Sequence, residues 1–182
     1  MKTAYLHLYQ ENKTAIHFVL KGAGLYAIWQ MIYYGLLTPY GNLDPWLTAM
    51  VADHSTEIIN NFFDTMPFMC ISDGANGKVV CIDDKVFIQI AHSCNGQVLY
   101  PIYAGFLILL PGKNWKKLIL ILGGTAVIYF SNIGRVISLL HIQLYYPQYL
   151  DISHHYIFTI LVYSVIFILW LMGMKWLKLN KT

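Results

Sequence analysis

Three kinds of chemically reactive side chain lie near the ends of successive apolar stretches in this chain. Cys94 opens one stretch, Arg135 lies late in the next, and His154 and His155 open the last. A thiol, a guanidinium and an imidazole form the set that acyl transfer through a cysteine requires, namely a nucleophile, an oxyanion stabiliser and a general acid/base. Each also has an ordinary explanation, because buried cysteines pack as small apolar side chains and Arg or His can sit at a membrane interface.

The elements that must position these residues are four apolar stretches. They cover residues 16–37, 94–111, 118–140 and 154–176. Each approaches the ~20 residues needed to cross a ~30 Å hydrocarbon core, and Pro101 in the second is tolerated where neighbouring helices satisfy the backbone. Charged residues make up only 12% of the chain, against roughly 25% in soluble domains. The sequence predicts an all-α membrane protein with four transmembrane helices in one domain, residues 1–182.

The distribution of positive charge predicts the orientation of these helices. Nine of the twelve Lys and Arg residues lie near the start of the chain, between the second and third stretches, or near its end: Lys2, Lys13, Lys21, Lys113, Lys116, Lys117, Lys175, Lys178 and Lys181. Cytoplasmic loops carry such an excess, so both termini are expected in the cytoplasm of a multi-pass protein of the cell inner (cytoplasmic) membrane. The net charge of +3, without a basic groove interleaved with aromatics, argues against nucleic acid as a partner.

Residues 38–93 are expected to form a small α+β subdomain outside the membrane, inserted between the first two helices. Residues 45–64 have helical periodicity, residues 73–77 read as a turn, and residues 78–82 and 86–90 read as short strands. The apolar positions expected on the helix are Trp46, Met50, Ile58, Phe62 and Phe63. Cys70 and Cys81 flank the turn, so a disulfide between them is one expectation and two free thiols are the other.

The reactive residues are expected at one depth in the membrane. At 1.5 Å per helical residue, Cys94 and Arg135 each lie roughly 26 Å from the cytoplasmic edge, and His154 and His155 roughly 30 Å. A helix N-terminus and a guanidinium both stabilise a thiolate, and Asn132, one turn from Arg135, could orient it.

Four histidines were considered as possible metal ligands. They are His54, His92, His141 and His154. They lack the spacing of a metal site, so neither a metal nor another cofactor is expected.

Three short motifs resemble those of one family. Cys94-Asn95-Gly96 at the outer start of a helix is similar to the Cys-Ser-Gly or Cys-Asn-Gly motif of exosortases and archaeosortases. Asn132-Ile133-Gly134-Arg135 resembles their Asn-x-x-Arg motif, and the segment from His154 to Phe158 resembles their histidine motif. The order and spacing match over about residues 86–176. Typical members carry further helices before this core, so the chain looks like a short member.

The resemblance implies a membrane-embedded cysteine protease or transpeptidase, a thiol protease of protein sorting. Its partner would be an exported protein with a C-terminal motif, a transmembrane helix and a basic tail, cleaved at the outer face of the membrane beside lipid. Cys94 would attack the peptide bond, Arg135 would stabilise the oxyanion, and the thioester would pass to an amine or to water.

Which histidine would act as the acid/base stays open. The His-x-x-x-Phe pattern of similar short members selects His154, whereas His155 shares a polar stripe with Thr159 and Tyr163 that should face protein.

A second hypothesis comes from a different functional class. Four helices with a small outer subdomain would also suit a non-catalytic membrane subunit or assembly factor of an export system. Such a scaffold should tolerate Cys94→Ala, whereas the enzyme should not. A transporter is disfavoured, because transport sites lie near the bilayer midplane and the reactive residues here are expected at the outer boundary.

Overall fold

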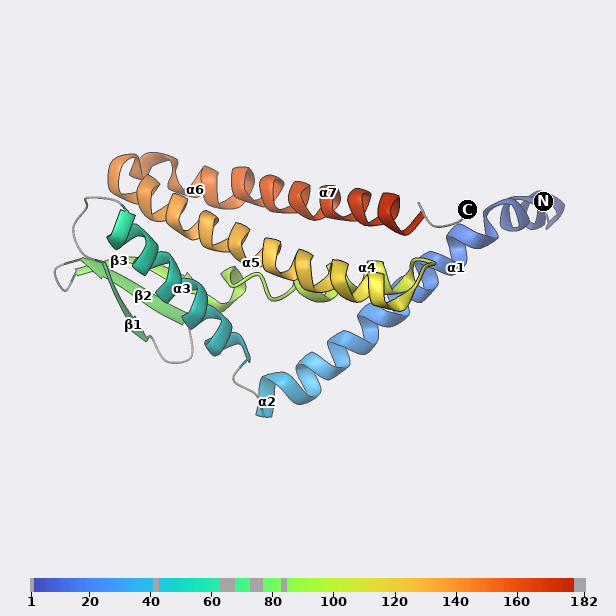
Figure 1. Cartoon of the computed structure of the whole chain (residues 1–182), viewed down its shortest axis with the longest axis horizontal. Coiled ribbons are helices and arrows are strands. Elements are labelled where there is room, and N and C mark those ends of the chain that lie inside the picture. Colours follow the sequence, from blue (N-terminus) through green and yellow to red (C-terminus); the bar gives the residue numbers. More distant parts are fainter. Residues whose placement is uncertain (1, 41–42, 63–67, 73–76, 83–84, 179–182) are drawn as a thin grey trace.

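The structure is a computed structural model, which describes residues 2–40, 43–62, 68–72, 77–82 and 85–178. Figure 1 shows long helices beside one another, with a small sheet and one shorter helix gathered at one end. The first turns of α1 and the last turns of α7 lie toward the opposite end. This arrangement agrees with the predicted placement of both ends of the chain on one side and of the insertion on the other.

The helical elements are α1 (Lys2–Ile32), α2 (Thr38–Tyr40), α3 (Leu43–Phe62), α4 (Leu99–Leu109), α5 (Asn114–Tyr145), α6 (Leu150–Ile152) and α7 (Phe158–Lys178). Two π-helical turns are built into this framework, η1 (Tyr33–Leu37) between α1 and α2 and η4 (Ser153–Ile157) between α6 and α7. Two 3₁₀ turns, η2 (His92–Cys94) and η3 (Pro147–Tyr149), precede α4 and α6. The fold is thus mostly helical, as predicted.

Two helical segments are long and apolar enough to cross a membrane, judged by length and composition over the described residues: Asn114–Tyr145 and Pro147–Leu177. They correspond to the third and fourth predicted spans. α4 is apolar but has 11 residues, which is only about 17 Å of helix. α1 covers the first predicted span and is long enough, yet it does not meet the same test. The count of four spanning helices therefore stays a prediction.

The second predicted span, residues 94–111, begins too early. α4 starts at Leu99, because the preceding residues are held in a non-helical link. Gly96 has φ of +78°, and the Asn95 side-chain oxygen accepts a hydrogen bond from the Gln97 backbone N–H at 2.8 Å. Such a local Asx-type bond competes with helix formation. Cys94 therefore precedes a helix rather than opening one.

Three antiparallel strands form the small sheet, in the order β1 (Met69–Ser72), β2 (Gly77–Ile82) and β3 (Lys85–Ala91). The two strands predicted from the sequence are confirmed as β2 and β3, and β1 is an addition. The predicted turn at 73–77 lies outside the described residues up to Gly77, which begins β2. α3 packs against all three strands and against α5, so the sheet is held to the outer end of the bundle.

The helix predicted at residues 45–64 is confirmed as α3, but its apolar face was predicted only in part. Ile58 packs against the core and Met50 is partly buried. Trp46 and Phe62 are 57% and 80% exposed, and Phe63 lies outside the described residues. The buried positions are Leu47, Thr48, Val51, Ala52, Ser55, Thr56 and Ile59. This stripe keeps helical spacing but includes small polar residues. The Ser55 hydroxyl donates to the Val51 carbonyl within the helix at 2.6 Å, whereas the Thr48 hydroxyl contacts Asn95 and His92 outside it. The hydrophobic pattern of the sequence alone could therefore not identify this buried stripe.

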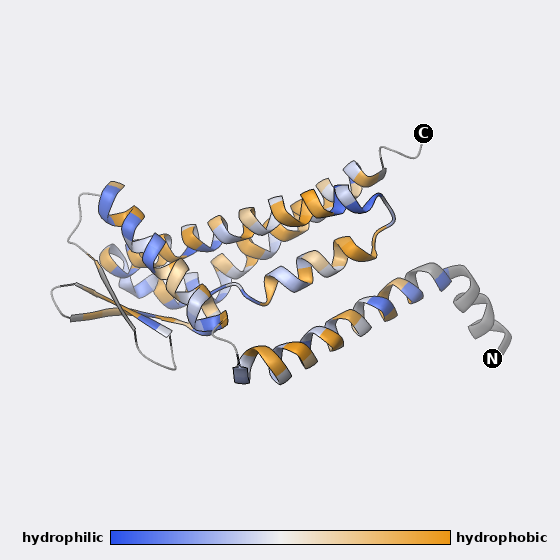
Figure 2. Cartoon of the chain, turned by 60° about the horizontal axis from the view of Figure 1, so that its bottom comes forward, coloured by the Kyte–Doolittle hydropathy of each residue, from blue (hydrophilic) through white to orange (hydrophobic). Residues whose placement is uncertain are grey.

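The described residues form two apolar cores that meet on α5 around Ile128 and Ile133. One lies between α3, the sheet and α5, around Val51, Val80 and Leu140. The other lies between α4, α5 and α7, around Tyr103 and Ile128. Cys94 packs against the first, and the link that follows it leads into the second. Figure 2 shows apolar residues predominating along α4 and α7, and many large apolar side chains of α5 and α7 point outward, as a lipid-facing surface requires.

A close contact at Gly124 fixes α4 against α5. A Cβ atom at Gly124 would overlap the Tyr103 ring, so only glycine lets the two helices approach in this way. The Tyr103 hydroxyl donates to the Leu120 carbonyl at 2.8 Å, and the Trp170 indole donates to the Tyr103 carbonyl at 3.4 Å. One buried tyrosine thus joins α4, α5 and α7. It helps to set the positions of α5, which carries Arg135, and of the segment Pro147–Leu177, which carries His154.

Candidate active site

Cys94 lies at the end of η2, on the link between the last strand and α4. The strand brings the chain from the outer subdomain to the bundle, and the link lies against α5. There the Asn132 amide nitrogen donates to the Cys94 carbonyl oxygen at 3.1 Å. Cys94 is partly exposed and forms no disulfide. The residue therefore has a fixed main chain and an accessible sulfur, as a nucleophile requires.

The thiol, the guanidinium and one imidazole converge. Cys94 Sγ lies 3.4 Å from His154 Nε2, and Arg135 Nη2 lies 3.1 Å from the same nitrogen and 3.9 Å from Cys94 Sγ. Residues from the link, α5 and η4 thus meet within hydrogen-bonding reach. The equal depth predicted from the sequence corresponds to direct contact.

His154 presents the lone pair of Nε2 to its neighbours. Arg135 carries only donors, so its Nη2 bonds to His154 Nε2 only when that nitrogen is the acceptor of a neutral imidazole. This tautomer carries its proton on Nδ1. A nitrogen lone pair 3.4 Å from the thiol is the form needed to take the proton of Cys94.

Arg135 has spare donor capacity toward the site. Its Nε is buried and has no hydrogen-bond partner in the described part of the chain. A buried unpaired donor costs about 1–3 kcal/mol, so an acceptor arriving with a substrate would recover stability. Nε and Nη2 lie on one edge of the planar guanidinium, and such an edge binds a single oxygen or a pair of oxygens in a fixed geometry.

His155 does not belong to this cluster. Its Nδ1 lies 3.1 Å from Asp151 Oδ1, and its side chain is 61% exposed. The stripe of His155, Thr159 and Tyr163, expected to face protein, is exposed throughout. The buried face of this helix instead carries Ser153 and Phe158. The His-x-x-x-Phe pattern therefore selected the histidine that reaches Cys94.

A π-helical turn presents His154. The widened turn η4 spans Ser153–Ile157 and sits between α6 and α7. π turns inside α-helices are rare and occur frequently at functional sites. The predicted fourth span began at His154, whereas the helical segment begins at Pro147 and His154 lies inside it. The helix N-terminus invoked from the sequence is therefore absent at His154 as well as at Cys94.

Asn95 fixes the link from the outer side. Its amide nitrogen donates to Asp44 Oδ1 at 3.0 Å and to Thr48 Oγ1 at 3.3 Å, both on α3. The other Asp44 oxygen accepts a hydrogen bond from the Tyr33 hydroxyl in η1, and Thr48 Oγ1 also lies 2.9 Å from His92 Nδ1. A buried polar network of this kind specifies one arrangement of its members when it is satisfied.

Gly96 is the third fixed point of the link. Its φ of +78° belongs to the left-handed region that glycine enters at little cost. A Cβ atom there would lie 3.3 Å from Asn132 Nδ2, the nitrogen that holds the Cys94 carbonyl. The Cys-Asn-Gly sequence is thus explained residue by residue, with a thiol, an anchoring amide and a turn without a side chain.

Two further sequence predictions concern Asn132 and the cysteines of the outer subdomain. Asn132 was expected to orient Arg135, but its nitrogen bonds to the Cys94 carbonyl and its oxygen has no partner in the described part of the chain. For Cys70 and Cys81 a disulfide and two free thiols were both expected alternatives, and Cys81 is buried without a disulfide. The strand register places Met69 opposite Cys81 and Val80 opposite Cys70, so the two cysteines are offset by one position in the ladder.

Sequence reasoning missed four residues of the network: Tyr33, Asp44, Thr48 and Asn95 as an anchor. Asp44 and Thr48 lie in the first two turns of α3, where Asp and Thr are ordinarily interpreted as capping residues. The one usable signal was Asn95 beside Gly96, since an Asn-Gly pair indicates a turn rather than the start of a helix. The histidines considered as metal ligands are separated by their contacts, His54 with Tyr129 and His92 with Thr48.

This arrangement can perform acyl transfer. It holds a nucleophile, a base on that nucleophile and a guanidinium edge directed at the same place. Arg135 and His154 lie on the two helical segments that are long and apolar enough to cross a membrane, and Cys94 contacts both residues.

Comparison with known protein families agrees with this class of site. Residues 13–173 match the family described as Transmembrane exosortase (Exosortase_EpsH). The match covers most of the chain, and the protein belongs to this family of membrane proteins. Neither curated proteins nor solved structures gave a match.

Proposed function

We propose that this protein is a membrane-embedded cysteine protease or transpeptidase that cleaves the C-terminal sorting signal of exported proteins at the outer face of the cytoplasmic membrane. The observation that carries the proposal is the contact of Cys94 Sγ with His154 Nε2, with Arg135 Nη2 against both. Membership of the exosortase family supports the same class of reaction.

The reaction begins with transfer of the Cys94 proton to His154 Nε2, and the thiolate attacks the carbonyl carbon of the scissile peptide bond. The carbonyl oxygen becomes an oxyanion, which Arg135 stabilises through Nη2–H and the unpaired Nε–H. As the intermediate collapses, the C–N bond breaks and His154 donates its proton to the leaving amine. The products are a thioester on Cys94 and a free transmembrane tail.

The second half-reaction runs in reverse with a new nucleophile. An amine or water attacks the thioester while His154 removes its proton, and Arg135 stabilises the second oxyanion. The C–S bond then breaks, and the sulfur recovers its proton from His154. An amine acceptor makes the overall reaction a transpeptidation and water makes it a hydrolysis.

The expected partner is an exported protein whose tail carries a short motif, a transmembrane helix and a basic cluster. The proposed orientation puts the basic cluster in the cytoplasm and the scissile bond outside, beside the link that holds Cys94. The nine lysines on the predicted cytoplasmic side and the outward apolar surface of α5 and α7 support this orientation.

The test is release of a reporter from such a tail in membranes that contain the full-length protein. The reporter carries the C-terminal tail of an exported protein from the same genome, with an epitope before the motif and another after the basic cluster. Wild type should separate the epitopes and Cys94→Ala should not. Hydroxylamine, which cleaves thioesters, should release the reporter as a hydroxamate from the acylated enzyme.

Cys81→Ala is the matched control, because it removes another free thiol, which is buried in the outer subdomain away from His154. It should retain cleavage. If Cys94→Ala separated the epitopes at the wild-type rate, the transpeptidase proposal would be wrong, and the non-catalytic subunit would become the better explanation.

A further inference from the structure

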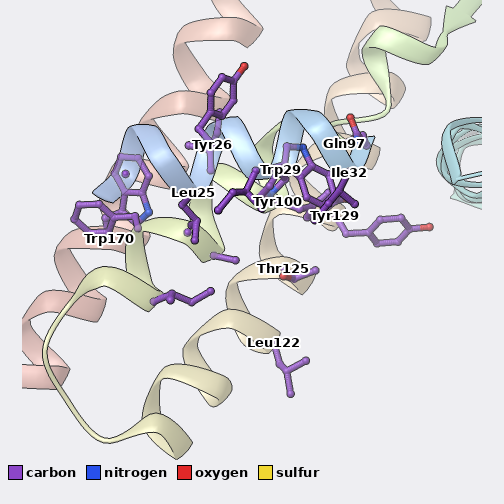
Figure 3. Close-up of a pocket in the computed structure, with 18 of the residues that line it drawn as sticks. Leu25, Tyr26, Trp29, Ile32, Gln97, Tyr100, Leu122, Thr125, Tyr129 and Trp170 are labelled. Carbon is purple, nitrogen blue, oxygen red and sulfur yellow. The ribbon is translucent and has the colours of Figure 1, made fainter. Parts of the chain in front are cut away.

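A large apolar groove lies between α1, α4 and α5. Its volume is about 1010 Å³, at the upper end of the ~300–1,000 Å³ of pockets that hold small ligands. Figure 3 shows Leu25 and Trp29 of α1 on one side of it and Leu122 and Thr125 of α5 on the other. The lining is almost entirely carbon. Its size and composition suit an apolar segment more than a polar metabolite.

One end of the groove is different, because polar side chains line it. Gln97 and Tyr100 contribute to the lining there (Figure 3). Gln97 is only 6% exposed, and its Nε2 has no hydrogen-bond partner in the described part of the chain. The buried Tyr100 hydroxyl also lacks a hydrogen-bond partner among the described residues. Unpaired buried polar atoms cost stability, so two of them at one end of an apolar groove indicate a ligand with polar atoms at that end.

This polar end adjoins the catalytic link. Gln97 directly follows Cys94-Asn95-Gly96, and its backbone N–H bonds to the Asn95 side chain. Tyr100 lies in the first turn of α4. A chain lying along the groove would therefore leave it at the loop that carries the nucleophile.

We propose that this groove binds the transmembrane helix of the substrate, with Gln97 and Tyr100 binding the polypeptide where that helix begins. The inference rests on the proposed function and adds the place at which the substrate's helix is held. The first N–H groups of a helix lack intrahelical acceptors, and the Tyr100 oxygen can accept from one of them. Gln97 Nε2 can donate to a main-chain carbonyl of the extended motif just before the helix, beside Cys94.

The first test is site-specific photo-crosslinking in membranes, with the Cys94→Ala protein to retain the uncleaved reporter. A photoreactive residue replaces Leu122 in the groove or, as control, Ile168 on α7. The two are comparably exposed, at 63% and 54%, but Ile168 is not part of the lining. Crosslinking to the reporter's helix is expected at 122 and not at 168. Equal capture at both positions, or capture of lipid alone at 122, would overturn the proposal.

The second test fills the groove. Ala126 lines it and the adjacent Val127 does not, and both are exposed on α5. Ala126→Trp should lower kcat/KM for the helix-bearing reporter by about tenfold or more, equivalent to about 1.4 kcal/mol, whereas Val127→Trp should change it less than about twofold. Alkylation of Cys94, measured by mass spectrometry of its own peptide, should keep its wild-type rate in both variants and so report an intact site.

The two proposals fail in different ways. A reporter that wild type does not cleave, yet which crosslinks at 122, would refute cleavage and leave the groove inference standing. A reporter that wild type cleaves, with Ala126→Trp and Val127→Trp equally active, would refute the groove inference and leave cleavage standing.

Discussion

Two adjacent histidines should respond very differently to alanine substitution. His154 Nε2 contacts both Cys94 Sγ and Arg135 Nη2, at 3.4 Å and 3.1 Å. Loss of a general acid/base costs about 10²–10⁴-fold in rate, or roughly 2.7–5.5 kcal/mol of transition-state stabilisation. His155 makes an exposed contact with Asp151, and such i,i+4 pairs contribute about 0.3–0.5 kcal/mol. Its ring also packs against that of His154, with centroids 4.8 Å apart, but this ring contact takes no part in proton transfer from Cys94. His155→Ala should therefore slow cleavage by less than about twofold.

The assay compares kcat/KM for reporter cleavage with the rate of Cys94 alkylation by iodoacetamide. Without the imidazole that accepts the thiol proton, His154→Ala should slow both processes. His155→Ala should slow neither, and it serves as the matched control because it removes the same ring from the neighbouring position. Equal losses in the two variants, or a larger loss in His155→Ala, would refute the assignment of the base and the mechanism built on it.

Three further changes test the rest of the site and the orientation of the chain. Arg135→Lys keeps the charge but loses the two-donor edge of the guanidinium. Its kcat should fall by about 10²–10³-fold, as when an oxyanion-hole donor is removed, and a wild-type kcat would refute oxyanion stabilisation by Arg135. Gly96→Ala forces a Cβ into the left-handed region beside Asn132 Nδ2 and should lower the free energy of unfolding by about 1–2 kcal/mol, seen as a lower melting temperature in detergent. In a variant whose native cysteines are replaced by alanine, a cysteine at Lys78 should react with a membrane-impermeant maleimide from outside and one at Lys113 should not, with the reverse pattern refuting the topology.

The convergence of the reactive residues could be predicted because it depends on quantities that a sequence carries. Helix rise converts residue spacing to depth, and the alternation of helix direction puts the outer end of each helix at a known residue. Cys94, Arg135 and His154 were placed together in this way. The predicted helix ends were wrong by several residues. These errors did not change the predicted depth of the reactive side chains, because depth was counted along the chain from the cytoplasmic edge.

The choice between the histidines could not be made by helix geometry. That argument assumed a regular α-helix from His154 onward, with polar residues facing protein. The segment instead starts earlier and contains a π turn, which shifts the faces of the residues around it. The exposed stripe of His155 and Tyr163 lies near the predicted membrane boundary, where polar side chains can reach water. The hydrophobic periodicity of a sequence does not reveal a π turn, in which the hydrogen-bonding pattern of the helix widens by one residue.

The anchoring of the link was also beyond sequence reasoning, because its partners are distant in the chain. Asp44 and Asn95 are joined by a 3.0 Å hydrogen bond, and neither has a neighbour in sequence that indicates the other. The buried face of α3 was predicted only in part for a related reason. Thr48 and Ser55 are polar by type, yet they are buried because their hydroxyls find partners inside the structure.

The outer subdomain therefore does more than cover the bundle. The Cys94 link is held from the membrane side by Asn132 of α5 and from the outer side by the contacts of Asn95 with α3. Both anchors lie on elements of the first core, α5 and α3, which pack against each other. Docking of α3 and the sheet on α5 therefore helps to hold Cys94 beside His154 and Arg135. The insertion between α1 and α4 is thus part of the framework of the proposed site.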